Sequence, residues 1–173
     1  MTLPTIRKAE SNDLKQIFEL EVALFGKDSY PYFFFCQALD ALGDLFFVIE
    51  IKKSKIIAYA LASLEKQRND AWVLSLGVHP DNQKEGFGKS LVIYLLKNLY
   101  EMGATFVYLH VSPDNAAARN LYKKMGFFVS RYEKDYFGLN HDRLIMKADL
   151  IKVIEKMEKP NNAYSRDFAS LSP

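Results

Sequence analysis

One glycine-rich segment, Gln83-Lys84-Glu85-Gly86-Phe87-Gly88, lies between an apolar strand pattern and an amphipathic helix pattern. The strand is expected to end near Val78, because Pro80 lacks the N–H that would continue a ladder. The first turn of the following helix offers N–H groups without internal acceptors at the positive end of the helix dipole. Because Gly86 and Gly88 have no Cβ, phosphate oxygens can approach the main chain there. The segment therefore predicts a site for the pyrophosphate of a phosphorylated cofactor.

The spacing of this segment excludes two common nucleotide-binding loops. A P-loop needs a glycine where this chain has Gln83, although Lys89-Ser90 follows the last glycine. The dinucleotide fingerprint Gly-x-Gly-x-x-Gly does not occur in the sequence. The segment instead resembles the acyl-CoA-binding motif Gln/Arg-x-x-Gly-x-Gly/Ala of the GNAT acetyltransferases.

Composition narrows the class of protein further. The chain has 173 residues, of which 49% are hydrophobic, and a net charge of +2 without a basic block, so nucleic acid is not an expected partner. Cys36 is the only cysteine, which rules out an intrachain disulfide and favours a reduced, cytoplasmic setting; it is expected in the core. No signal-peptide pattern and no membrane-spanning apolar run is found, so no membrane partner is expected.

Hydrophobic periodicity predicts a mixed α/β fold with a strand–helix–strand crossover and some parallel pairing. A single domain is expected over 1–150, followed by an extension, 151–173, with a helical turn or two before a mobile end. Ser11-Asn12-Asp13 is expected to cap the first helix. The strands are predicted over 5–9, 45–51, 55–64, 71–78, 105–112, 127–137 and 143–148, and the helices over 14–25, 31–42, 87–102 and 116–125.

A second motif follows the predicted strand 105–112. It matches the GNAT pattern Asn-x-x-Ala-x-x-Leu-Tyr-x-x-x-Gly-Phe, most closely in the branch that acetylates protein N-termini and the alanine of a bacterial ribosomal protein. The resemblance implies the GNAT fold, in which a central, mostly antiparallel mixed sheet of six to seven strands is flanked by about four helices. It also implies acetyl-CoA as the acyl donor and no metal. The matching residues are Asn115, Ala118, Leu121, Tyr122, Gly126 and Phe127.

The resemblance assigns roles to particular residues. Leu76 and Val78 are expected to bind the pantetheine arm through their main chain, and Asn115 to contact the cofactor from the other side. Tyr122 is expected to contact the cofactor and to donate a proton to the leaving thiolate, without a covalent enzyme intermediate. The residues expected to bind the pyrophosphate are Gln83, Lys84, Glu85, Gly86, Phe87, Gly88 and Lys89.

His110 occupies the strand position where bacterial relatives carry a glutamate base and some eukaryotic relatives a histidine that works through water. The partner tyrosine of those relatives is replaced here by Trp72, which takes no proton. Strand alternation puts His110 on a more polar face than its neighbours, and a structural role for it stays open. If it is the base, the activity is expected to show a limb near pH 6.5. Tyr136 resembles an aromatic residue that grips the peptide, and Tyr30 is a candidate wall of the acceptor site.

Three functions are compatible with these residues. The first is acetyl transfer to the N-terminal α-amine of a protein or peptide. The second is acetylation of a small amine such as a polyamine, an amino acid or an antibiotic, with Glu133 and Asp135 attracting the cation. The third is a catalytically weak module that binds acetyl-CoA. A monomer or a homodimer is expected.

Overall fold

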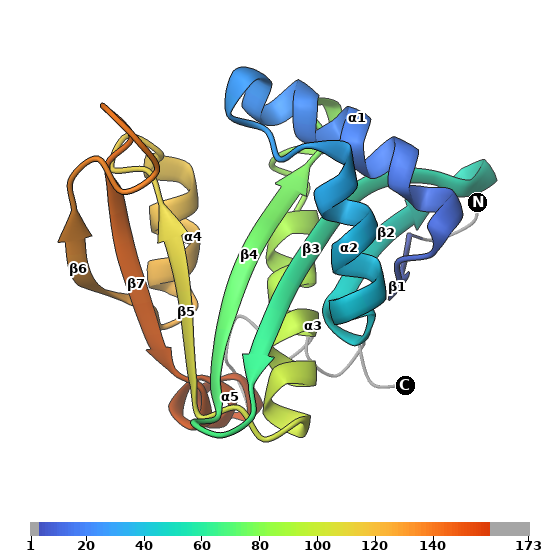
Figure 1. Cartoon of the computed structure of the whole chain (residues 1–173). Helices are drawn as coiled ribbons and strands as arrows, with labels where there is room; N and C mark the ends of the chain where they lie inside the picture. The colour runs from blue at the N-terminus through green and yellow to red at the C-terminus, as the bar shows by residue number, and fades with distance from the viewer. Residues whose placement is uncertain (1–3, 160–173) are drawn as a thin grey trace. The chain divides into compact units, whose positions relative to one another are not determined.

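The computed structural model describes residues 4–159. In this part of the chain, seven strands form one mixed sheet in the order β1-β2-β3-β4-β5-β7-β6 (Figure 1). The strands are β1 (Thr5–Lys8), β2 (Phe46–Ile51), β3 (Lys55–Glu65), β4 (Asp70–Val78), β5 (Phe106–Val111), β6 (Phe128–Glu133) and β7 (Arg143–Asp149). The α-helices are α1 (Leu14–Phe25), α2 (Tyr32–Leu42), α3 (Phe87–Glu101), α4 (Ala116–Lys124) and α5 (Leu150–Glu158), and none of these is long and apolar enough to cross a membrane. The predicted α/β class is confirmed, with five α-helices where about four are expected.

The chain divides into two compact units. Unit 1 contains the chain up to Ser63 together with Ser75–Leu95, and unit 2 contains Leu64–Leu74 together with the chain from Leu96 onward. The strands β3 and β4 and the helix α3 each contribute residues to both units.

Unit 1 has helices on both faces of its strands. Successive side chains of β2 point to opposite faces. Phe46 faces α2, where its ring lies 6.3 Å from that of Phe35, and Phe47 faces α3, where its ring lies 5.1 Å from that of Tyr94. Figure 1 shows α1 and α2 over one face of β2 and β3, and α3 behind the other. Both faces of the strand are therefore buried.

Gly77 permits the closest packing within unit 1. A Cβ on Gly77 would lie 2.6 Å from Cδ1 of Leu24 on α1 and 2.7 Å from Cε1 of Tyr59 on β3. The Tyr59 ring, which is fully buried, therefore lies directly against the main chain of β4. Any larger residue at position 77 would push β4 away from α1 and Tyr59.

The start of α1 differs from the prediction that Ser11-Asn12-Asp13 supplies a simple cap. These residues form a short 3-10 turn before α1. The Asp13 carboxylate accepts a hydrogen bond from the Glu10 N–H at 2.8 Å and pairs with both terminal nitrogens of Arg7, at 2.7 and 2.9 Å. Arg7 also donates to Glu50 at 2.6 Å, so the start of the helix is fixed by charges on β1 and β2.

Unit 2 contains the parallel pairing expected from the sequence. Asp70–Val73 of β4 pairs parallel with Phe106–Leu109 of β5, and β7 pairs antiparallel with both β5 and β6. The helix α5 is longer than the predicted turn or two, because four of its side chains enter the core of this unit: Leu150, Val153, Ile154 and Met157. The segment 161–173, predicted to be mobile, lies outside the described residues.

The strand predicted over 127–137 is wrong at its end, because β6 stops at Glu133. The chain turns at Asp135, whose φ is +53° and whose N–H donates to Asp142 at 2.9 Å. Asp142 also accepts from the Tyr132 hydroxyl, and Asp135 accepts from the Asn140 N–H at 2.6 Å. These carboxylates accept hydrogen bonds from main-chain N–H groups that would bond to a neighbouring strand if β6 continued. Tyr136 therefore lies in the β6–β7 loop.

The burial of α2 differs from residue to residue. Cys36, expected in the core, is half-buried. The aromatic run from Tyr30 is mixed, since Phe35 is fully buried while Tyr32 and Phe33 are 43% and 63% exposed. Only one face of α2 therefore contributes aromatic side chains to the core.

Gly77→Ala tests the close packing of Tyr59 against β4. We expect the substitution to lower the free energy of unfolding by about 1–3 kcal/mol, because the new methyl group meets a buried ring at less than contact distance. Thermal unfolding followed by circular dichroism measures the change. The matched control is Gly43→Ala, whose Cβ would meet Leu39 at an ordinary 3.9 Å. Equal melting temperatures for the two variants would contradict the packing described here.

Candidate functional site

The loop before α3 has the geometry of an anion site. Lys84 and Gly86 adopt positive φ values of +66° and +93°, which turn successive peptide groups. A Cβ on Gly86 would meet no atom within 4 Å, so the space above this residue is open. The helix α3 starts at Phe87, and the main-chain N–H groups of its first turn have no acceptor within the helix. Residues 83–86 are exposed and 87–90 half-buried, so the loop is accessible to a ligand.

The strand β4 leads directly into this loop. Its burial alternates, with Ser75 and Gly77 buried and Leu76 and Val78 half-buried on the opposite face. The side-chain Nε2 of Gln83 donates a hydrogen bond to the main-chain oxygen of Val78 at 3.2 Å, which holds the loop at the end of the strand. Leu76 and Val78 thus present one accessible face beside the anion loop.

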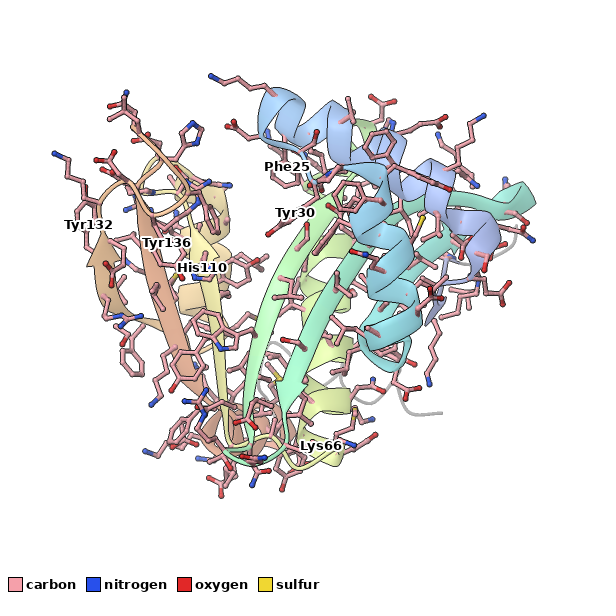
Figure 2. All side chains as sticks on the ribbon, viewed as in Figure 1. Phe25, Tyr30, Lys66, His110, Tyr132 and Tyr136 are labelled. Carbon is pink, nitrogen blue, oxygen red and sulfur yellow. The ribbon has the colours of Figure 1, made fainter. Side chains whose placement is uncertain are left out.

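An aromatic cluster surrounds His110 in unit 2. Its imidazole stacks on the Trp72 indole, with ring centroids 4.8 Å apart and planes 22° from parallel. Tyr136 lies 4.8 Å and Phe137 5.3 Å from the same imidazole. Figure 2 shows His110 on β5 and Tyr136 in the loop beside it. The structure therefore brings together Trp72, His110 and Tyr136, as the sequence predicts.

His110 is a neutral imidazole at pH 7. Burial disfavours its charged form, and the nearby Arg143 and Arg131 guanidinium groups add repulsion, so the pKa of His110 is lowered. Its Nε2 is buried and has no hydrogen-bond partner among residues 4–159. If His110 is the base, its lowered pKa predicts an activity limb below pH 6.5.

The helix α4 carries the other predicted residues of unit 2. The side-chain oxygen of Asn115 caps this helix by accepting from the Ala118 N–H at 3.0 Å. Tyr122 is 7% exposed, and its ring lies 5.6 Å from that of Phe127. Burial raises the pKa of the Tyr122 hydroxyl to about 12. The phenol thus keeps its proton at neutral pH.

Tyr30, the predicted acceptor wall, lies in the segment between α1 and α2 of unit 1 (Figure 2). Its ring stacks on that of Phe34 at 4.2 Å. Its main-chain N–H donates to the carboxylate of Glu21 at 2.9 Å. Sequence reasoning misses Glu21, although one signal is visible: a charged residue stands within the apolar stripe of the predicted helix.

The cation-attracting role suggested for Glu133 and Asp135 is not favoured by their surroundings. Glu133 pairs with Arg131 at 3.4 Å, and Asp135 accepts the Asn140 N–H. Both carboxylates are therefore engaged within β6 and its loop.

Comparison with known proteins gives a consistent result along most of the chain. Residues 12–127 match the model of the acetyltransferase (GNAT) family. An N-alpha-acetyltransferase from Sulfurisphaera tokodaii is 31% identical over 156 residues, covering 84% of this chain and 92% of that relative. The N-terminal acetyltransferase B complex catalytic subunit NAA20 from Arabidopsis thaliana is 26% identical over 159 residues, covering 89% and 90%. The fold is similar to a crystal structure of the NatC complex bound to Gag peptide and CoA, with a TM-score of 0.78 at 18% identity, covering 86% of this chain and 99% of that one.

Titration of the imidazole by NMR tests the electrostatics around His110. We expect its pKa to lie below 6.5, and Arg143→Gln to reverse only part of the lowering, because burial is the larger cause. The chain has three histidines, so His110→Gln assigns the signal. The control is Arg68→Gln, which removes a cation paired with Glu65 on the β3–β4 turn. A wild-type pKa of 6.5 or above would contradict this account.

Proposed function

This chain belongs to the acetyltransferase (GNAT) family and is an N-acetyltransferase that uses acetyl-CoA, and we propose that its acceptor is the N-terminal α-amine of a protein or peptide. The likeness to named N-alpha-acetyltransferases over 84% of the chain supports this acceptor. The aromatic cluster around a neutral His110 is the observation that carries it.

The donor is assigned to the loop before α3. The main-chain N–H groups of Gly86, Phe87 and Gly88 would hold the pyrophosphate, supported by the open space above Gly86 and its positive φ. Lys84 and Lys89 add positive charge near these groups, and Gln83 and Glu85 complete the loop. Leu76 and Val78 would bind the pantetheine arm through the accessible face of β4, and Asn115 contributes from the start of α4.

The lowered pKa of His110 favours an acceptor of low basicity. An α-amine titrates near pH 8 and a lysine amine near pH 10.4, so a lysine costs about 3.3 kcal/mol more to deprotonate at neutral pH. A base weaker than free histidine deprotonates an α-amine much more readily than a lysine. His110 would take this proton through a water molecule.

The chemical step needs one base, one acid and one hydrogen-bond donor. The acceptor amine attacks the thioester carbonyl, which acetyl-CoA supplies, and a C–N bond forms as the C–S bond breaks. The Val78 N–H stabilises the developing oxyanion, His110 takes the amine proton, and Tyr122 gives its proton to the sulfur. The high pKa of Tyr122 keeps this proton available at neutral pH.

The acceptor contacts are assigned to aromatic side chains. Trp72 and Tyr136 flank His110 and offer flat surfaces to the backbone of an extended peptide. Tyr30 contributes a third aromatic surface from the α1–α2 segment.

A panel of acceptors tests the proposed function. We expect acetyl-CoA to modify the α-amine of short peptides, and to leave the same peptides unmodified when the α-amine is blocked and only a lysine is free. Mass spectrometry with fragmentation locates the acetyl group. Polyamines and free amino acids belong in the same panel. Turnover of these small amines without turnover of any peptide would refute the proposed acceptor.

Tyr122→Phe tests the general acid. We expect kcat to fall by about 10²-fold or more, while acetyl-CoA affinity measured by calorimetry stays unchanged. The variant should fold normally, because the buried ring is retained. Gly86→Val is the opposite control, since it strains a residue at φ +93° in the anion loop and should abolish acetyl-CoA binding. An unimpaired kcat in Tyr122→Phe would leave Tyr122 a packing role only.

A further inference from the structure

A buried polar network in unit 1 has no part in the chemistry described so far. Glu21 on α1 is 1% exposed, and its carboxylate accepts hydrogen bonds from three groups. These are the Tyr59 hydroxyl, the Tyr30 main-chain N–H at 2.9 Å and the Ser75 hydroxyl at 3.5 Å. The Tyr59 and Ser75 hydroxyls are also 2.8 Å apart. One carboxylate thus joins α1, the α1–α2 segment, β3 and β4.

A carboxylate is a costly residue at this position. Burial raises the pKa of Glu21, and the three hydrogen bonds offset that cost only in part. The pKa of Tyr59 is also raised, by burial and by the Glu21 charge, so its phenol stays protonated and donates. An apolar side chain would fill the same stripe of α1 between Ile17 and Leu24 without this cost. Stability alone therefore does not explain a glutamate here.

The three donors point to a different role. Tyr30 carries the aromatic surface assigned to the acceptor, and Ser75 immediately precedes Leu76, which is assigned to the donor. The Tyr59 ring packs against Gly77, which lies between Leu76 and Val78. The carboxylate therefore connects the acceptor segment to the strand that binds the donor, entirely within unit 1.

We infer that Glu21 is a positioning residue of the acceptor site, which holds the main chain at Tyr30 against β3 and β4 so that the Tyr30 ring is fixed before the acceptor binds. The inference rests on the proposed function, because Tyr30 contacts the acceptor only if that function holds. Without this bond the α1–α2 segment must be ordered by the acceptor itself, which weakens acceptor binding and leaves the chemical step intact.

Glu21→Leu is the main test. The apolar side chain has a similar volume but no acceptor, so the Tyr30 N–H and the Tyr59 hydroxyl both lose their bond to residue 21. We expect the KM for the acceptor to rise about tenfold, with kcat within about twofold of wild type and acetyl-CoA affinity unchanged. An unchanged acceptor KM would overturn the inference.

Gln16→Leu is the matched control on the same helix. The Gln16 amide also ties α1 to the chain, by donating to Ser54 O and accepting from Ile56 N, both at 3.0 Å, but it does not contact the α1–α2 segment. We expect this variant to lose stability without a change in acceptor KM. A comparable rise in acceptor KM would mean that any weakening of α1 has this effect, and would overturn the specific role of Glu21.

Amide hydrogen exchange separates this inference from the proposed function. In wild type the Tyr30 amide should exchange more slowly than the amides of the exposed residues Lys27 and Asp28, and Glu21→Leu should remove that protection while Gln16→Leu retains it. This measurement requires no acceptor, and its first result comes from the wild-type protein alone. Fast exchange at Tyr30 in wild type would overturn the inference, whereas failure of every peptide acceptor would refute the proposed function alone.

Discussion

The contact between the Tyr59 ring and the bare main chain at Gly77 sets the position of β4 in unit 1. A side chain at Gly77 would occupy the space of that ring and of Leu24. The ring lies against β4, and its hydroxyl contacts both Ser75 on β4 and Glu21 on α1. The half-buried residues Leu76 and Val78 lie on either side of Gly77 in the same strand. The following loop is bound to this strand by the hydrogen bond from the Gln83 side chain to the main-chain oxygen of Val78. Close packing on the buried face of β4 thus fixes the position of the strand, and with it the position of the main-chain groups of Leu76 and Val78.

Burial acts on two ionisable groups of the protein in opposite senses. It raises the pKa of Glu21 and lowers that of His110, because in each case it disfavours the charged form. Glu21 is compensated by three hydrogen-bond donors, so its oxygens are committed to the protein. The Nε2 of His110 has no such partner among the described residues, which leaves it available for a proton. The two buried groups therefore differ in whether their polar atoms have hydrogen-bond partners.

Local chemistry made part of the structure predictable. The loop conformation at Gly86 and the alternation around His110 depend on residues within a few positions, and both are found. Glu21 was missed because its partners Tyr59 and Ser75 lie 38 and 54 positions away in the sequence. The end of β6 was missed because Asp142, beyond the loop, supplies the acceptor for Asp135. The pKa of His110 required the burial and the two arginines that only the fold brings near it.

The helix α5 has a consequence for the order in which the protein is made. Unit 2 begins at Leu64, yet its core includes Val153, Ile154 and Met157 near the end of the described chain, and a Cβ on Gly126 would lie 3.0 Å from Cγ2 of Val153. Unit 1 has all its segments once Leu95 has been synthesised. On the ribosome, the loop before α3 can therefore reach its folded environment while α4 and the cluster around His110 still await α5. A nascent chain arrested between these points would hold this loop without Tyr122.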